Sequence, residues 1–284
     1  MQRDYLIGPL RWHLKKISRR AAIGLSRHWP GASGPRLRVL TYHRFGTRRY
    51  DPVAIPPEAF EGHLRWLSEH AQVIDAAGFA GWLDGTRQMR HNTVLITVDD
   101  GHYSFYEHAL PILRRYGFSA VLFVCPDLIE ADEPPPAPAR PREFMSWREL
   151  EAVQAQGLTI GSHGLSHRSL ARMSPREAEA EIVAAQAVLE SRLGTRSPWF
   201  AFPFGTRADF SDRLARFLVR RGYDFCFTSI HGHCRPPAAH TLLPRLKIEA
   251  GEDLELFGSI VEGHLDNWSV VDNAAWWIQQ RQAL

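Results

Sequence analysis

The 284-residue sequence contains little cysteine and no long apolar run. Its three cysteines, Cys125, Cys226 and Cys234, make no even set of disulfides and include no Cys-x-x-Cys pair, which argues against a disulfide-stabilised fold and a cysteine zinc site. No segment approaches the ~18 apolar residues that a membrane span needs, and the N-terminus lacks the continuous apolar core of a signal peptide. We therefore expect a globular, cytoplasmic protein.

Acidic residues are scarce at the N-terminus. Residues 1–36 hold eight basic residues and one acid, a charge of +7, so the rest of the chain carries 3 − 7 = −4 of the net +3. Because the basicity belongs to this segment alone, the overall charge does not predict nucleic-acid binding, and we expect no nucleic-acid partner.

The N-terminal segment has a regular apolar pattern. Apolar residues recur every three or four positions, beside a basic face formed by Arg11, Lys15 and Arg19; they are Leu6, Leu10, Leu14, Ile17, Ala21 and Leu25. This pattern predicts a basic amphipathic helix, which either contacts an anionic membrane peripherally, at the inner face, or packs on the protein body. We expect residues 1–36 to form this leader and residues 37–284 to form the main domain.

From Leu37 onward, short apolar runs alternate with helical patterns, as in a mostly parallel sheet. Seven or eight strands predict an α/β fold with a (β/α) barrel, distorted or incomplete, while a doubly wound open sheet is the competing arrangement. Active residues gather at the carboxyl ends of strands in both. The expected strands are Leu37 to Tyr42, Gln72 to Ile74, Val94 to Val98, Ala120 to Cys125, Leu158 to Ile160, Trp199 to Phe202, Phe225 to Thr228 and Leu242 to Ile248.

Two adjacent carboxylates, Asp99 and Asp100, follow the buried strand that ends at Val98, and Gly101 comes next. Successive side chains of an extended chain point in opposite directions, so the two carboxylates meet different surroundings and can take different roles. One could bind a metal while the other moves a proton. An ordinary Asp-Gly turn is the alternative.

Two further motifs follow predicted strands. His163 and His167 lie four residues apart, so two imidazoles and one carboxylate could form a three-ligand metal site with open positions. The run Phe200-Ala201-Phe202-Pro203-Phe204-Gly205 ends a strand with rigid backbone and aromatic surface that could stack on a sugar, or simply marks a core strand followed by a turn.

Together these motifs resemble a known family. Thr97 to Gly101 resembles the Thr-Phe-Asp-Asp-Gly motif of the polysaccharide deacetylase (NodB-homology) family. His163 to His167 resembles its His-(Ser/Thr)-x-x-His motif, and Phe200 to Gly205 is similar to its Phe-Ala-Tyr-Pro-Tyr-Gly motif. The order and approximate spacing match, and the resemblance covers roughly residues 37–248.

The resemblance implies a metal-dependent hydrolase that removes N-acetyl, sometimes O-acetyl, groups from glycans. By motif position, Asp100, His163 and His167 would bind a divalent metal, usually zinc, and Asp99 would be the general base. Pro203, Phe204 and Gly205 would border the substrate, a glycan or lipid-linked saccharide of envelope or exopolysaccharide biosynthesis. Asp99 as a further metal ligand is the alternative.

The sequence also departs from the family pattern. Ala201 stands where many members carry the arginine that accompanies the base, Phe204 replaces a tyrosine, and the late Leu-x-His that supplies the general acid is not evident. His43, in a Tyr-His element similar to that of the poly-N-acetylglucosamine deacetylase subgroup, is the expected acid. Arg245, in a Leu-Pro-Arg element, is expected to orient Asp99.

Several features stay open at this point. His102, His231 and His233 receive no role, and the proline-rich run over residues 133–141 is expected to be an exposed loop beside the site. A degenerate member that binds glycan without hydrolysing it, or a deacylase of small amides, would carry much of the same pattern. A facial iron oxygenase shares the ligand types but usually has His-x-Asp spacing on an all-β fold.

Overall fold

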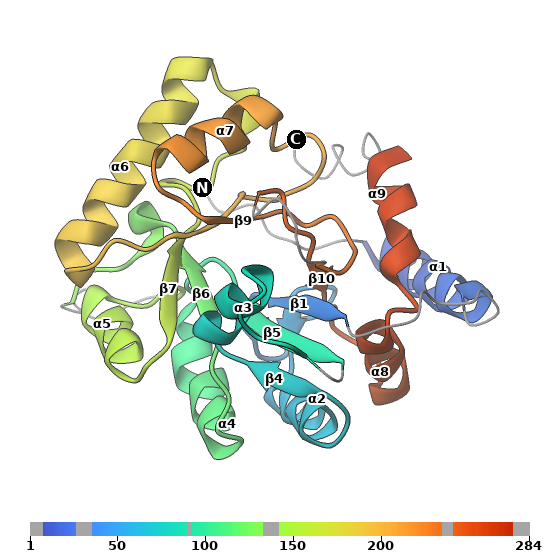
Figure 1. Ribbon diagram of the computed structural model, residues 1–284. Coiled ribbons are helices and arrows are strands. Elements are labelled where there is room, and N and C mark those ends of the chain that lie inside the picture. Colours follow the sequence, from blue (N-terminus) through green and yellow to red (C-terminus); the bar gives the residue numbers. More distant parts are fainter. Residues whose placement is uncertain (1–7, 27–35, 90–91, 133–141, 235–240, 275–284) are drawn as a thin grey trace.

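A computed structural model describes residues 8–26, 36–89, 92–132, 142–234 and 241–274. Its main sheet is parallel and curls into a half-barrel surrounded by helices (Figure 1). The strands are β1 (Leu37–Tyr42), β4 (Gln72–Ile74), β5 (Thr93–Val98), β6 (Val121–Val124), β7 (Thr159–Ser162), β8 (Trp199–Ala201), β9 (Phe225–Phe227) and β10 (Leu246–Lys247). A separate pair joins β2 (Arg44–Phe45) to β3 (Ala54–Ile55).

The strand order shows why the sheet curls. It runs β10-β1-β5-β6-β7-β8-β9, and β4 pairs with β5 off this path. An isolated bridge from Phe227 to Leu243 joins β9 to the segment that leads into β10, so the order returns to its start. The distorted (β/α) barrel expected from the sequence is confirmed, and the open doubly wound sheet was the wrong alternative.

The helices lie around this sheet. They are α1 (Pro9–Ser26), α2 (Pro57–His70), α3 (Ala76–Leu83), α4 (Leu110–Arg115), α5 (Trp147–Ala155), α6 (Pro175–Leu193), α7 (Asp212–Arg220), α8 (Leu254–Glu262) and α9 (Ser269–Ala274), and a π-helical turn (Phe105–Ala109) leads into α4. Capping boxes at Ser146 and Ser174 begin α5 and α6, because a side-chain oxygen there satisfies an amide that has no partner within the helix.

Apolar side chains fill both sides of the sheet. β1 and β5 are buried along their whole length, so they read as continuous apolar runs rather than alternating ones. Inside the curl, Phe123 leaves no room for a side chain at Gly161, since a Cβ there would lie 2.6 Å from the ring. The rigid interior fixes where each strand ends, and the candidate site lies at those ends.

Most of the expected strands are observed at or near their predicted bounds. The last one is much shorter than the predicted Leu242 to Ile248, because only β10 pairs with β1. Helix α3 and the β2–β3 pair were not predicted. The proline-rich run lies outside the described residues.

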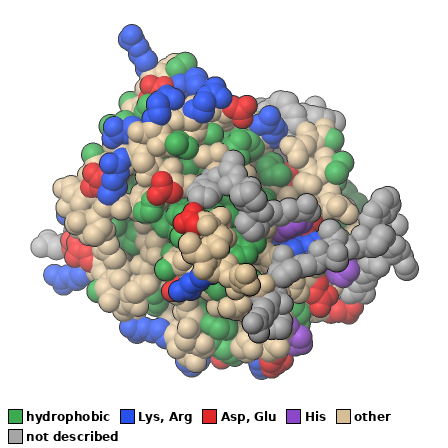
Figure 2. All heavy atoms as spheres, in the orientation of Figure 1, with side chains coloured by type: hydrophobic (Ala, Val, Ile, Leu, Met, Phe, Trp, Pro, Cys, Tyr) green, Lys and Arg blue, Asp and Glu red, His purple; other side chains and the backbone are tan. Residues whose placement is uncertain are grey.

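Basic side chains on the surface are not confined to the N-terminal segment, where the sequence has its excess of basic residues. Figure 2 shows Lys and Arg side chains gathered in the upper part of the view, where α6 and α7 lie.

Helix α1 packs against α8 and the segment after β10. Within the described part of the chain, no helix has both the length and the apolar character needed to cross a bilayer.

Candidate active site

The predicted site residues come together although they are scattered along the chain. Each follows, or directly precedes, a strand of the curled sheet, and most of the side chains are buried. The residues and their strands are His43 after β1, Asp99 and Asp100 after β5, His163 and His167 after β7, Pro203, Phe204 and Gly205 after β8, and Arg245 before β10.

The backbone adopts the left-handed conformation at Asp100, directly after Asp99. Asp100 has φ 75° and Gly101 has φ 77°, whereas non-glycine residues rarely adopt a positive φ. A Cβ at Gly101 would lie 3.1 Å from the side chain of Val124. This backbone conformation costs free energy, and the tightly packed surroundings hold it in place, as is common at functional sites.

Asp100 faces the two histidines that the sequence paired with it. Its Oδ1 lies 3.1 Å from His167 Nε2 and 3.5 Å from His163 Nε2, and the three potential ligand atoms all lie within 4.8 Å of one another. His163 Nδ1 donates a hydrogen bond to the carbonyl of Ala201 at 2.8 Å, which directs the Nε2 lone pair toward Asp100. One carboxylate and two imidazoles form a donor set that suits zinc and similar ions, so these residues fit a divalent metal.

The charges in this cluster favour an ionised Asp100. Burial alone would raise the pKa of Asp100, but the charge of His167 and the close contacts with the surrounding imidazoles outweigh it and hold that pKa well below its usual value. Burial would likewise lower the pKa of His167, yet the neighbouring Asp100 raises it overall. The cluster is therefore electrostatically negative on the side of Asp100, where a cation would sit.

Asp99 lies beside this three-residue cluster, with Oδ2 3.9 Å from His163 Nε2, and is held by Arg245. Two hydrogen bonds join them, Nη1 to Oδ1 at 2.7 Å and Nη2 to Oδ2 at 2.8 Å. Arg245 is itself fixed because its Nε donates to the carbonyl of Thr228 at 2.9 Å and its side chain is almost fully buried. Burial would raise the pKa of Asp99, but the Arg245 guanidinium lowers it overall, so the carboxylate is ionised.

His43 lies near Asp99, on the side of the oxygen that Arg245 Nη2 also contacts. Its Nε2 is 4.0 Å from Asp99 Oδ2, and its side chain is buried. Burial lowers the pKa of His43 to about 3, although Asp100 and Asp99 oppose the shift, so the ring is neutral at pH 7. A group at this position can act as an acid only after it has received a proton.

The third motif forms the edge of the cluster. The ring of Phe204, a residue with φ 62°, contacts the ring of His167 edge-on at a centroid distance of 4.7 Å. Gly205 donates to the carbonyl of Pro203 at 2.7 Å, and a Cβ at Gly205 would lie 2.7 Å from the backbone nitrogen of Ser229. This turn therefore requires glycine and fixes the aromatic ring beside the candidate metal ligands.

A second set of contacts to Asp100 involves His102, which the sequence placed near the pocket without a role, and Arg44, which it missed. His102 Nε2 lies 3.4 Å from Asp100 Oδ2 and accepts a hydrogen bond from Arg44 Nε at 3.0 Å. Arg44 is held in turn by Asp51 at 2.9 Å. Arg44 directly follows His43, but a lone arginine after a strand gave no signal for this contact.

The two other unassigned histidines lie elsewhere. His231 pairs with Asp272 through Nδ1 at 2.8 Å, and His233 pairs with Asp266 at 2.8 Å. Both pairs lie on the side of the molecule where α1 and α9 meet the sheet rather than in the cluster around Asp100. Neither histidine therefore extends the candidate metal site.

Comparison with known proteins agrees with this geometry. Residues 86–225 match the family model described as polysaccharide deacetylase. A putative polysaccharide deacetylase of Bacillus subtilis (strain 168), YxkH, is 21% identical over 228 residues, which are 80% of this chain and 76% of that protein.

Two solved structures share the fold. IcaB from Ammonifex degensii superposes with a TM-score of 0.68 at 23% identity, covering 82% of this chain and 98% of that one. The Streptococcus pyogenes deacetylase PplD, solved in complex with acetate, gives a TM-score of 0.67 at 20% identity, covering 78% and 96%. The family model, the relative and the shared half-barrel lead to one conclusion: this chain is a hydrolase of the polysaccharide deacetylase family.

Proposed function

We propose that the chain removes N-acetyl groups from an N-acetylhexosamine-containing glycan or lipid-linked saccharide, with a divalent metal, expected to be zinc. The observation that carries the proposal is that two adjacent carboxylates make different contacts. Asp100 faces His163 and His167, while Asp99 lies against Arg245 and is free of that set. A metal-dependent amide hydrolase uses both a metal site and a separate base.

In this proposal, Asp100, His163 and His167 hold the ion. When bound, the metal polarises the amide carbonyl and lowers the pKa of a coordinated water to near ~7. Asp99 is the base, since it is ionised and its Oδ2 lies 3.9 Å from His163 Nε2, at the border of the metal set. Arg245 keeps the carboxylate in this orientation through both of its oxygens.

His43 supplies the proton that the leaving amine requires. Its ring is neutral at the start and lies 4.0 Å from Asp99 Oδ2, so the proton taken up at Asp99 has a short path to the imidazole. Because burial lowers the pKa of His43, the protonated ring gives up its proton readily to an amine. The acid and the base are thus direct neighbours.

Substrate contact is assigned to the turn formed by Pro203, Phe204 and Gly205. The Phe204 ring beside His167 offers an apolar edge next to the metal ligands, where an acetyl group or a sugar ring would lie. The expected cytoplasmic location, peripheral to the inner face of the membrane, stays a prediction.

The test is an acetate-release assay on N-acetylglucosamine oligomers with the full chain. We expect release that chelation stops and that zinc add-back restores. Asp99→Asn should abolish release, whereas the matched variant Asp266→Asn, which changes a carboxylate paired with Arg38 outside the site, should retain it. Release that survives Asp99→Asn would refute the assignment of the base.

Two alternatives give different results in the same assay. A degenerate member would retain glycan without metal-dependent acetate release, and a small-amide deacylase would release acid only from short acyl amides. The sequence feature that favoured degeneracy was Ala201 at the usual arginine position. The Arg245 contact with Asp99 now supplies a guanidinium from another strand, which supports the active enzyme.

A further inference from the structure

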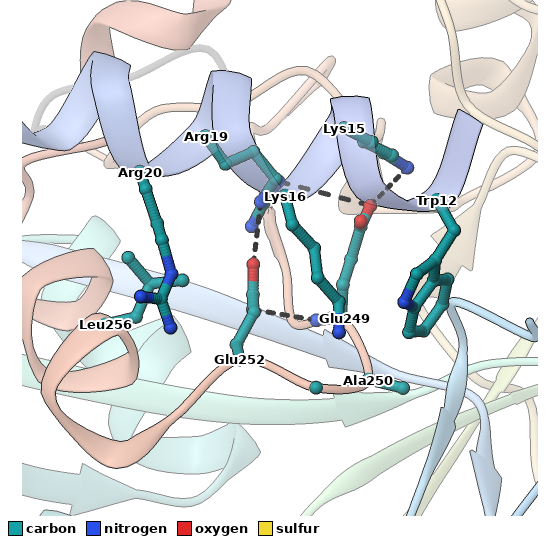
Figure 3. A pocket seen from close by; sticks show the side chains of 10 residues that line it. Trp12, Lys15, Lys16, Arg19, Arg20, Glu249, Ala250, Glu252 and Leu256 are labelled. Carbon is teal, nitrogen blue, oxygen red and sulfur yellow. Dashed lines mark hydrogen bonds and ion pairs between the residues drawn. The ribbon is translucent and has the colours of Figure 1, made fainter. Parts of the chain in front are cut away.

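Helix α1 is attached to the rest of the protein by its charged side. Lys15 Nζ lies 2.6 Å from Glu249 Oε1, and Arg19 Nε lies 2.7 Å from Glu252 Oε1 (Figure 3). The Arg19 and Glu252 side chains are only 3% and 2% exposed. Arg20 forms a further pair with Asp253 at the start of α8. Lys15 and Arg19 therefore face inward, whereas Arg20 lies at the edge of this contact and stays 58% exposed.

Other contacts fix the rotation of the helix. Arg19 Nη2 donates to the carbonyl of Lys247 at 3.1 Å, and the Ile23 side chain is buried in the main core. Ser26 Oγ donates to the carbonyl of His264 at 2.5 Å. With 3.6 residues per turn, these inward positions leave the opposite side of α1 facing solvent.

That outer side is apolar. Leu10 is 73% exposed, Leu14 57% and Ile17 64%, and Ala21 continues the same stripe at helical spacing. Arg11 and Arg20 are also exposed, one on each flank of the stripe. Apolar residues with cations on both flanks are typical of a helix that lies in the plane of a membrane interface.

Exposed aliphatic residues gather on this side of the molecule. Among the described residues, eight large hydrophobic side chains are classed as exposed, and six of them are on α1, α8 and α9: Leu10, Leu14, Ile17, Leu254, Val270 and Val271. Figure 1 shows these three helices together at one side of the sheet. The other two, Val183 and Val219, belong to α6 and α7 across the molecule.

We propose that the outer stripe of α1 docks on a lipid surface that carries anionic headgroups. Apolar side chains enter the acyl boundary, and Arg11 and Arg20 at the flanks lie at the height of the phosphates. A second copy of the chain is a poorer occupant, because one stripe of Leu10, Leu14 and Ile17 offers far less than the about 800 Å² per partner of a stable interface. The docking does not depend on the proposed deacetylation.

The test is co-sedimentation of the full chain with vesicles, which requires no turnover. The vesicles contain either phosphatidylglycerol mixed with phosphatidylcholine or phosphatidylcholine alone. The variant combines Leu10→Gln, Leu14→Gln and Ile17→Gln, and the matched control combines Val183→Gln and Val219→Gln. Acetate release from a soluble oligomer and the thermal midpoint are measured on the same proteins.

We expect the wild-type chain to bind the mixed vesicles more tightly than phosphatidylcholine alone, with an affinity that falls as salt rises. Each aliphatic side chain fully taken out of water contributes about a tenfold step, so the α1 variant, which changes three of them, should bind more weakly by up to about 1,000-fold. Its activity and thermal midpoint should not change, and the control should bind like wild type.

Three outcomes would overturn the proposal. One is equal vesicle binding by wild type and the α1 variant. Another is loss of binding in the α6–α7 control, because Lys and Arg side chains also gather there (Figure 2) and that face would then be the docking surface. The third is a dimer in sedimentation velocity that the α1 variant dissociates while vesicle binding is absent, which would assign the stripe to a second copy.

Discussion

Arg245 provides the sharpest single test of the site. Its guanidinium binds both oxygens of Asp99 at 2.7 and 2.8 Å in a buried setting. Arg245→Gln removes the charge and leaves an uncompensated carboxylate, which costs about 3–5 kcal/mol of the free energy of unfolding. A urea titration measures this loss directly.

The chain contains a matched control for this loss. Arg38 binds Asp266 through Nε at 3.2 Å and Nη2 at 2.9 Å, and its side chain is as buried as that of Arg245. Arg38→Gln should therefore lower stability by a similar order without touching the site. Any difference in activity between the two variants then belongs to Asp99 rather than to folding.

The expected difference is large. A correctly placed general base contributes about 10²–10⁴ in rate, so Arg245→Gln should lower kcat of the folded enzyme at least about 100-fold. Arg245→Lys should recover part of the stability but little of the rate, because an ammonium cannot bind both oxygens in one plane. If Arg245→Gln lost stability like Arg38→Gln yet kept wild-type kcat, the positioning role would be refuted.

Four further outcomes follow from other contacts. Burial lowers the pKa of His63 to about 3, so the folded state stays unprotonated while the unfolded state gains a proton below pH ~6.5. The contribution of His63 to stability should therefore fall by about 2 kcal/mol between pH 7 and 5. His63→Asn should reduce the pH dependence measured in urea titrations by this amount, the exposed His70→Asn should not, and an unchanged pH dependence would contradict the explanation. Gly205→Ala should lower the thermal midpoint, since φ is 61° and its Cβ would lie 2.7 Å from a backbone nitrogen, at a cost of about 1–3 kcal/mol. Arg19→Gln should cost about 3 kcal/mol or more in urea, because buried carboxylates lose their cation; wild-type stability would show that α1 is not attached through it. Asp100→Ala should lose its metal in mass-spectrometric metal analysis while keeping its circular dichroism, and retained metal would refute the ligand set.

The sequence was most informative where chemistry follows directly on a buried strand. Asp99, Asp100 and the histidine pair were identifiable because polar residues rarely end such strands without a role. Parallel strands bring their carboxyl ends to one edge, so local patterns were sufficient to place His163 and His167 near Asp100. The structure brings these three side chains within 4.8 Å of one another.

Contacts between distant segments do not follow from local patterns, and the contact of Arg245 with Asp99 was predicted only through the resemblance to the family. Arg245 and Asp99 are 146 residues apart, and only the position of β10 beside β1 brings them together. Arg44 and His102, 58 residues apart, meet because they follow β1 and β5, which pair directly in the sheet. Sequence patterns record the local periodicity of a segment but not the partner that it meets.

The rotation of α1 shows another limit. The spacing of Leu10, Leu14 and Ile17 predicted a helix correctly, but an apolar stripe is the same whether it faces a core, a membrane or water. The side that faces inward is decided by Glu249 and Glu252, more than 200 positions away. Those acids lie in an ordinary turn and gave no sign of a helix partner.

The ion pairs that attach α1 to the segment after β10 also constrain how relatives of this chain can differ. Glu249 and Glu252 are buried acids whose counter-charges come from another part of the sequence, Lys15 and Arg19. A relative without an equivalent of α1 would expose both carboxylates to water, because this helix covers them and supplies their counter-charges (Figure 3). We therefore expect the four positions to vary together, with no preference for acids at 249 and 252 wherever the helix is missing. The helix and the barrel would then be inherited as a single unit.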